Sequence, residues 1–563
     1  MRNVENMSSL RDQRKLPRIG VILCQCGKEI RDALNFVELE EHARALPGVV
    51  YLKADPYPCS RPGIAALTSA IKENQLERVV IAGCTPRLHG RLMAQACESA
   101  GLNRWFVEIA NIREHCSRVH KDKPKATEKA KELIAGSVRK VSLATACEPV
   151  RSKPRTAILV VGGGVSGLSV AAKLADLNHD VTLIEKKDVL GGMLLRLDKP
   201  YPYGRPAKEI VKERISRIDG RVKILKQTEI VSLKGAPGQY MVQLSIAGKT
   251  EEQVFGAIVV AIGAECVALE ETLRAPLLEG LADFGGRVLT QIELEAELAG
   301  QRLKGIRSAL VVSMPLPQLS HSGSRLYTLV ALKNAALLKE ANTELQVWFL
   351  FKDVPSELER EFRRAKGAGV NFVRPEDETM LKFVKDGLRG CGELEINVDV
   401  IVLPTVLAMP QSARNLAQIL RIPIDGQGFF IQPHIKLWQG DFAERGIFVV
   451  GSCHSPATLL ESAAQAEATA SWASRFVRGE IVRAPFFSKI DRKVCRGCSR
   501  CAETCEWDAI EMTTLDNGLK LAIVDEILCT GCGVCSTVCI NGAPSLAPVS
   551  QRQIRAMLEV VGA

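Results

Sequence analysis

Eight cysteines near the C-terminus have the spacing with the clearest chemistry. They form two runs, CRGCSRCAETC and CTGCGVCSTVC, each spaced C-x2-C-x2-C-x3-C. This spacing is typical of paired [4Fe-4S] clusters, because three thiolates of one run bind one cluster and the fourth binds the other. Two zinc sites are the alternative, but they would not call for this doubled run. We therefore predict one cluster on Cys495, Cys498, Cys501 and Cys539, and a second on Cys529, Cys532, Cys535 and Cys505.

Five further cysteines lie in the first 120 residues, each at the end of an apolar run. Because the ends of parallel strands meet at one edge of a sheet, these thiols could supply four ligands to a third iron–sulfur cluster. Redox-active thiols, a zinc site and plain buried cysteines are the alternatives. The candidates are Cys24, Cys26, Cys59, Cys84 and Cys116. The remaining cysteines are isolated and are expected to be small buried side chains, namely Cys97, Cys147, Cys266, Cys391 and Cys453.

A glycine turn in the middle of the chain predicts a dinucleotide site. The apolar run AILVV is followed by GGGVSG and then by SVAAKLADLNHD, whose apolar spacing is helical. Gly162 would form the tight turn, Gly164 would let the backbone approach a pyrophosphate, and Gly167 would let helix and strand pack closely. A second strand ends in Glu185, which can bind ribose hydroxyls. The predicted contacts are Gly162, Gly164, Val165, Ser166, Gly167, Glu185 and Lys186, with Gly192, Ile230, Ala261, Gly263 and Gly451 from later segments.

FAD is favoured over NAD because further segments follow in the order typical of two-dinucleotide flavoproteins. LGG lies just beyond Glu185, VVAIGAE reads as a returning strand, and GIFVVGSC reads as a late strand before a long helix. A pyridine-nucleotide reductase would need a second glycine fingerprint after the strand SALVVS. That place reads MPLPQLSHSG, so the sequence does not support a nicotinamide site.

The elements that position these residues predict an α/β protein. We expect an α/β domain over residues 1–150, with a probable iron–sulfur site at its strand ends. A Rossmann-like, thioredoxin-reductase-like FAD domain is expected over 151–484, with an inner subdomain over about 266–400. A bacterial-type 2[4Fe-4S] ferredoxin domain is expected over 485–547, and a tail over 548–563.

The chain resembles the HdrA family, the flavin-containing iron–sulfur proteins of heterodisulfide reductase. The resemblance rests on CQCGKEI, CSRPG, VVIAGCTPRLH, AGLNRWFVEIANIREHCSRVH, GGGVSG, LGG, VLTQIELEAEL, FRRAKGAGVNFVRPE and the tandem ferredoxin motif. It implies an oxidoreductase subunit that passes electrons between partner subunits through flavin and clusters, in some members by flavin-based bifurcation.

Two departures from that family stand out. Family members often carry an extra ferredoxin insertion after LGG, whereas this chain continues there without a cysteine. A stretch that is rich in cysteine in the family here has Gly323, Tyr327 and Thr328, so the cluster expected there should be missing. The resemblance also places Lys333 near the flavin ring, as a catalytic candidate. A solvated helix lysine is the alternative.

Composition excludes several classes of protein. Of the 563 residues, 46% are hydrophobic and 25% are charged, as in ordinary globular proteins. The sequence has no apolar run long enough for a membrane-spanning helix, and the first twenty residues are too polar for a secretory signal, so we expect a cytoplasmic protein. Aromatic residues are scarce at 5% and basic residues are dispersed, which argues against nucleic-acid binding.

These observations predict a flavin and iron–sulfur electron-transfer subunit. Its partners would be HdrB- or HdrC-like subunits, or hydrogenase- or dehydrogenase-linked subunits of a larger complex. Ferredoxin is a further candidate partner, and a homo- or hetero-oligomer is expected. One alternative is a self-sufficient FAD-dependent reductase that uses NAD(P)H or a disulfide. Another is a non-catalytic iron–sulfur scaffold or redox sensor.

Overall fold

The computed structural model describes most of the chain, and its residues group into two compact units. Unit 1 comprises Met1–Arg151 and Val482–Ala563, and unit 2 comprises Ser152–Ile481. No described helix is long and apolar enough to cross a lipid bilayer. The described residues are 16–202, 204–267, 281–300, 302–303, 305–313, 321–375, 381–390, 395–431, 446–483, 485–515 and 517–561.

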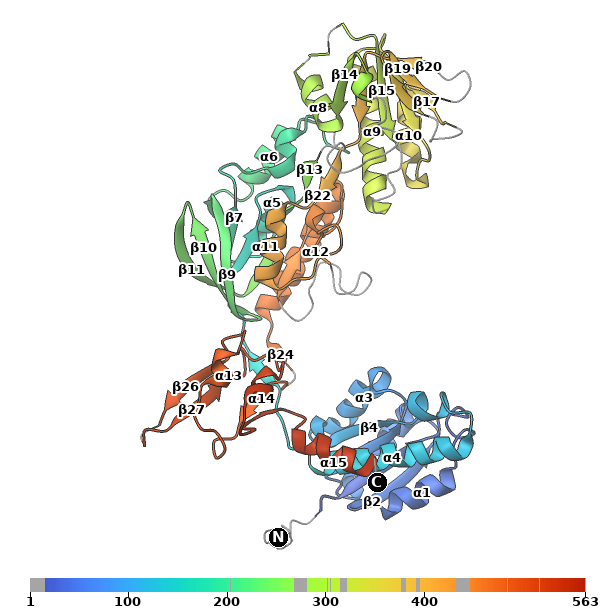
Figure 1. The fold of residues 1–563 in the computed structure, drawn as a ribbon, viewed down its shortest axis with the longest axis vertical. Coiled ribbons are helices and arrows are strands. Elements are labelled where there is room, and N and C mark those ends of the chain that lie inside the picture. The colour runs from blue at the N-terminus through green and yellow to red at the C-terminus, as the bar shows by residue number, and fades with distance from the viewer. Residues whose placement is uncertain are drawn as a thin grey trace. The chain divides into compact units, whose positions relative to one another are not determined.

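The N-terminal part of unit 1 is a parallel sheet covered by helices on both faces (Figure 1). Its strands, in the order β2-β1-β3-β4, are β1 (Ile19–Cys24), β2 (Val49–Asp55), β3 (Arg78–Gly83) and β4 (Val107–Asn111). One face packs against α1 (Phe36–Ala45) and α4 (Lys123–Ser142), and the other against α2 (Arg61–Glu73) and α3 (Pro86–Ser99). Every residue of β1 is buried, as expected for a central strand covered on both faces.

The C-terminal part of unit 1 is built from short elements that the cysteine loops connect. Two antiparallel pairs frame it, β25 (Ser488–Ile490) with β28 (Pro544–Leu546), and β26 (Ile510–Thr514) with β27 (Lys520–Val524). The short helices α13 (Arg500–Glu503) and α14 (Val534–Val538) begin within the two cysteine runs. The final helix α15 (Gln551–Val561) packs on α4, where Gln553 Nε2 donates to the Lys140 carbonyl oxygen at 3.4 Å.

Unit 2 contains a five-stranded parallel sheet in the order β23-β12-β6-β7-β8 (Figure 1). These strands are β6 (Ile158–Val161), β7 (Val181–Glu185), β8 (Lys223–Lys226), β12 (Ala257–Val260) and β23 (Ile447–Val449). Helices α5 (Val165–Asp176) and α12 (Leu459–Arg478) bury one face. The other face packs against α11 (Gln411–Leu420) and the antiparallel strands β9 (Thr228–Ala236), β10 (Gln239–Ile246) and β11 (Lys249–Phe255). Helix α6 (Ala207–Ser216) and the short sheet of β5 (Val150–Ser152) and β24 (Ile481–Arg483) complete this part of the chain.

A second parallel sheet in unit 2 has the order β14-β21-β15-β16-β17. Its strands are β14 (Arg287–Thr290), β15 (Ser308–Ser313), β16 (Gln346–Phe351), β17 (Asn371–Val373) and β21 (Val400–Leu403). One face packs on α8 (Gln291–Ala299), α9 (His321–Ala341) and α10 (Glu359–Gly367), and the other on β18 (Lys382–Val384), β19 (Gly387–Arg389) and β20 (Glu395–Asn397). The pair β13 (Glu265–Val267) and β22 (Val406–Ala408) lies where the chain enters and leaves this part. The α/β class expected from the sequence is confirmed.

Candidate functional site

A cavity of about 840 Å³ in unit 2 extends from the glycine turn to α8 and α9. Cofactor and ligand sites typically have volumes of about 300 to 1,000 Å³. Two predicted contacts, Gly167 and Gly451, lie outside the lining. The other predicted contacts line the cavity, and they are Gly162, Gly164, Val165, Ser166, Glu185, Lys186, Gly192, Ile230, Ala261, Gly263 and Lys333.

The glycine turn is held by backbone contacts that exclude larger side chains. Gly162 has φ 109°, and a Cβ there would lie 2.5 Å from the Ala261 carbonyl oxygen. A Cβ on Gly167 would overlap the Gly162 carbonyl oxygen, so Gly167 keeps α5 close to the strand. A Cβ on Gly164 would instead meet only the Cα of Gly192, at 3.9 Å. The backbone at Gly164 therefore faces open space, as the approach of a pyrophosphate requires.

Two helices begin at the cavity wall. Gly164 is the N-cap of α5 and supplies no side-chain hydrogen bond to the first turn, so N–H groups there are available for an anion. Thr458 caps α12, and Thr458, Leu459 and Ser462 line the cavity. Gly451 lies behind this wall, where a Cβ would overlap Ser166 Oγ. Its role is close packing at the start of α5.

Glu185 at the end of β7 is fixed by two backbone N–H groups. Its Oε2 accepts from Gly163 N–H at 2.7 Å, and its Oε1 accepts from Lys187 N–H at 2.8 Å. Each carboxylate oxygen keeps a further lone pair. These lone pairs can accept hydrogen bonds from ribose hydroxyls, so the cavity end near Glu185 suits the adenosine half of a dinucleotide.

The segment LGG forms a second glycine loop against the first. Gly191 N–H donates to the Gly163 carbonyl oxygen at 2.8 Å. Gly192 has φ 56°, and a Cβ there would lie 2.9 Å from the Cα of Gly164. The two loops therefore touch backbone to backbone, and together they form the floor where a pyrophosphate would lie.

The inner end of the cavity holds a buried ion pair. Lys333 Nζ on α9 lies 2.6 Å from Glu295 Oε1 on α8, and the two side chains are 10% and 1% exposed. Lys333 Nζ also donates to the Lys199 carbonyl oxygen at 3.0 Å. Burial lowers the pKa of Lys333, while the charge of Glu295 opposes that shift. Lys333 is thus a buried, paired cation at the cavity wall rather than a solvated helix lysine.

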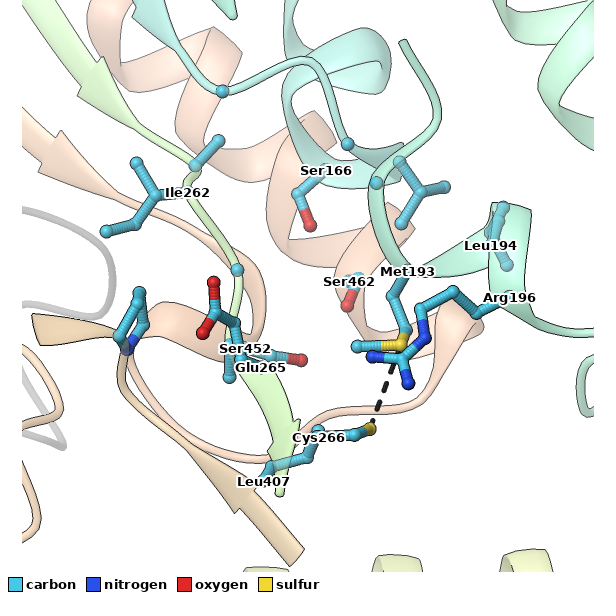
Figure 2. A pocket seen from close by; sticks show the side chains of 18 of the residues that line it. Ser166, Met193, Leu194, Arg196, Ile262, Glu265, Cys266, Leu407, Ser452 and Ser462 are labelled. Atoms are coloured by element: carbon cyan, nitrogen blue, oxygen red, sulfur yellow. Dashed lines mark hydrogen bonds between the residues drawn. The ribbon is translucent and has the colours of Figure 1, made fainter. Parts of the chain in front are cut away.

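Cys266 on β13 also lines this end of the cavity, unlike the other isolated cysteines. Its Sγ lies 3.7 Å from Met193 Sδ, and Figure 2 shows the two side chains together beside Arg196. Burial raises the pKa of the Cys266 thiol to about 11, and the charge of Arg196 opposes the shift. Cys97, Cys147 and Cys453 are buried, and Cys391 lies outside the described residues.

The C-terminal cysteines gather as their spacing requires. Cys495, Cys498, Cys501 and Cys539 line one small cavity of about 20 Å³, which brings the last cysteine of the second run to the first three of the first run. At the second predicted set, Ser488 N–H donates to Cys529 Sγ and Ala509 N–H donates to Cys505 Sγ, each at 3.4 Å. Burial raises the pKa of Cys529, and the nearby thiolate charges of Cys535 and Cys505 raise it further.

Four of the five N-terminal cysteines lie together at the C-terminal edge of the sheet. Cys24 ends β1, Cys26 follows it, and Cys59 and Cys84 follow β2 and β3. Burial raises the pKa of the Cys24 thiol to about 12, and charges on Cys26, Cys59 and Cys84 add to that shift. The Arg113 guanidinium, 13% exposed, donates to Cys26 Sγ at 3.2 Å.

Cys116 differs from these four. Its side chain is fully buried in the core formed by β1, β3, α1 and α4. Burial raises its pKa to about 11, and the charged neighbours that modify this shift are Lys129 and Glu132 rather than other thiols. The structure therefore separates Cys116 from the four cysteines that it brings together. Among the described residues, C-terminal cysteines included, no group of three or more His, Cys, Asp or Glu side chains is arranged to hold a metal ion.

Residue-by-residue reasoning did not single out Glu295 and Gln291, although both lie in the quoted segment VLTQIELEAEL. Gln291 begins α8 and Glu295 lies one turn later, so the two side chains lie on the same helix face. The capping box of Thr290 and Glu293 marks the start of this helix and could have indicated that register.

Comparisons with known proteins agree with this geometry. A family model described as pyridine nucleotide-disulphide oxidoreductase matches residues 140–312, and a 4Fe-4S dicluster domain matches residues 494–543. Among solved structures, thioredoxin reductase of T. acidophilum is 14% identical, covers 58% of this chain and 100% of its own, and has a TM-score of 0.38.

Two curated relatives extend the match along most of the chain. Both are the iron–sulfur or ferredoxin-reducing "A" component of a heterodisulfide reductase. The one from the CoB–CoM heterodisulfide reductase of Methanopyrus kandleri is 29% identical and covers 89% of this chain and 92% of its own. The one from the H(2):CoB-CoM heterodisulfide,ferredoxin reductase of Methanothermobacter marburgensis is 27% identical over 88% of this chain and 91% of its own. The chain is an oxidoreductase with an FAD-type domain and a 4Fe-4S dicluster domain, and it belongs to the HdrA family of heterodisulfide reductase proteins.

Proposed function

We propose that this chain is the electron-transfer subunit of a heterodisulfide-reductase-like complex. In this role it converts two-electron chemistry at FAD into one-electron transfer through clusters. The observation that supports the proposal most directly is that one chain combines a dinucleotide-sized cavity with two gathered sets of cysteines. FAD accepts electrons in pairs and releases them singly, whereas each cubane carries one electron at a time.

The residues around the cavity would bind FAD without a covalent bond. The first turn of α5 and the two glycine loops would hold the pyrophosphate, and Glu185 would hold the ribose. At the inner end, the Lys333 ammonium and the Glu295 carboxylate would place a fixed charge pair beside the flavin ring. Lys333 would thus act on the ring through its charge and its N–H donors.

We propose three [4Fe-4S] clusters in total. Two lie in the C-terminal domain on the sets of four cysteines predicted from their spacing. The third lies at the N-terminal sheet edge on Cys24, Cys26, Cys59 and Cys84, with Cys116 as a core residue. The domain bounds 1–150, 151–484 and 485–547 belong to the same proposal.

The partners would be further subunits of the complex, and substrate chemistry would take place on them. Relatives are named for reactions of a heterodisulfide with hydrogen and ferredoxin, which supports partners that donate or accept electrons. Where related chains carry a cysteine-rich stretch, this chain has Tyr327 and Thr328. Tyr327 accepts a hydrogen bond from Leu407 N–H at 2.8 Å, and Thr328 Oγ1 donates to the Ser324 carbonyl oxygen at 3.0 Å. We therefore propose electron transfer without a cluster on this stretch.

The proposal can be tested with the full chain loaded with FAD, iron and sulfide. After anaerobic reduction, a one-electron acceptor should oxidise the protein rapidly. The variant Cys501→Ser should keep its flavin and lose most of that rate, because the first C-terminal cluster loses a ligand. The matched variant Cys97→Ser, at a buried cysteine outside both sets, should keep the rate. Equal rates in Cys501→Ser and the unaltered chain would contradict the proposal.

A self-sufficient NAD(P)H reductase is the second candidate, because the matched family model is described by pyridine nucleotides. The segment that lacks a second glycine fingerprint begins after Ser313, and residues 314–320 lie outside the described residues. Under our proposal, NADH and NADPH should not bleach the flavin of the isolated chain, whereas a low-potential donor should. Rapid and saturable bleaching by either nucleotide would favour the reductase.

A further inference from the structure

Gln291, the first residue of α8, carries an unpartnered donor at the inner end of the cavity. The side chain is 2% exposed and lines the cavity. Its Nε2 atom has no hydrogen-bond partner among the described residues. A buried donor without a partner is costly in a folded protein, so one in a cavity wall indicates an acceptor on a ligand.

The orientation of this amide follows from its neighbour on α9. Asn334, which is fully buried, donates through Nδ2 to the Gln291 backbone carbonyl oxygen at 3.3 Å and to Gln291 Oε1 at 2.7 Å. Because a backbone carbonyl can only accept, the atom that Asn334 presents must be its nitrogen. Gln291 must then present its oxygen to Asn334, which leaves Nε2 directed away from Asn334.

The position of Gln291 in the cavity identifies the half of FAD that it would meet. The adenosine half belongs at the opposite end, where Glu185 lies at the end of β7. Gln291 lies one helical turn before Glu295, and Asn334 follows Lys333, so the amide pair and the ion pair occupy the same end. The ring system of a bound FAD therefore belongs beside Gln291.

We propose that Gln291 Nε2 donates a hydrogen bond to an acceptor atom of the flavin ring, and that Asn334 is the positioning residue that holds this amide. The inference rests on the proposed binding of FAD and adds a named contact to it. A neutral donor at this place stabilises the more negatively charged, reduced ring, because hydrogen bonds to charged acceptors are stronger. The contact therefore raises the reduction potential of the bound flavin.

The test compares Gln291→Met and Gln291→Glu in the full chain loaded with FAD, with the midpoint potential and visible spectrum of the flavin as readouts. Gln291→Met keeps the side-chain length and removes the donor, and we expect about a tenfold loss of reduced relative to oxidised flavin, equivalent to about −30 mV. Gln291→Glu should lower the potential further, because it adds a negative charge. Asn334→Leu should cause a smaller decrease, since the donor remains but is no longer held.

Gln553→Met is the matched control, because Gln553 is a buried glutamine in unit 1, outside the cavity. It should leave the flavin potential unchanged. Gln291→Glu differs from the native residue by one group and guards against misfolding of the methionine variant. If both variants bind FAD fully and keep or raise its potential, the inference is wrong. If the unaltered chain binds no FAD, the proposed function itself fails.

Discussion

The two cysteine sites of unit 1 share a ligand atom but depend on different levels of structure. The C-terminal ligands lie within two short runs, and the loops and helices α13 and α14 of those runs position them. The N-terminal ligands come from the ends of three different strands, so they meet only when the sheet order β2-β1-β3 has formed. One site is therefore a property of local spacing, and the other is a property of the tertiary fold.

The largest expected effect removes the site that depends on local spacing. The double variant Cys495→Ser and Cys529→Ser takes one ligand from each C-terminal cluster. Iron content should fall from about twelve to about four atoms per chain. Substitution is preferable to truncation here, because α15 packs on α4 and its removal would expose that helix. A fall to zero iron would contradict an N-terminal cluster, and unchanged iron would contradict the C-terminal ones.

A second pair of variants tests the N-terminal site alone. Cys59→Ser should lower the iron content by about four atoms, because a cubane is lost. Cys116→Ser should leave the iron content unchanged, because that side chain lies in the core away from the other thiols. Equal iron loss in the two variants would place Cys116 among the ligands.

A core substitution beneath the N-terminal site separates the two levels of structure more finely. Leu23 is fully buried in β1, and Leu23→Ala should cost about 2–5 kcal/mol of unfolding free energy. In a urea titration, the N-terminal cluster should then bleach at a lower concentration, while the C-terminal signals keep their midpoint. Ile523→Ala, at a side chain 43% exposed on β27, is the control and should shift neither midpoint. Parallel shifts of both signals in Leu23→Ala would show that the two sites unfold together.

The smallest expected effect concerns a buried cysteine outside both sets. Burial raises the pKa of Cys97 to about 12 in the folded chain, against 9.0 for an exposed thiol. The protonated thiol is the form that the fold favours, so its contribution is complete below pH 9 and is lost as pH rises from 9 to 12. The slope is about 1.4 kcal/mol per pH unit in that window. Denaturation of Cys97→Ala should be less pH-dependent by that amount, and an identical slope would contradict the assignment.

Local spacing predicted much of this molecule. The C-terminal cysteine pairing and the glycine turn follow from motifs of fewer than about twenty residues, each with a physical reason for its residue types. Strand and helix periodicity predicted the α/β class for the same reason.

The remaining features needed the fold because they join distant segments. The Lys333–Glu295 pair links α9 to α8 across 38 positions, and no spacing rule relates those residues. The exclusion of Cys116 depends on which side of its turn faces the core. The donor of Gln291 is defined by Asn334, which lies 43 positions away.

An anaerobic reductive titration of the full chain, loaded with FAD, iron and sulfide, tests the central claim most directly. The flavin should take up two electrons and each cluster one, so we predict about five electron equivalents per chain. Flavin and cluster absorbance should reach equilibrium with each other at every step. Uptake that stops at two equivalents, or clusters that stay oxidised beside a reduced flavin, would contradict an electron-transfer subunit that joins the two kinds of cofactor.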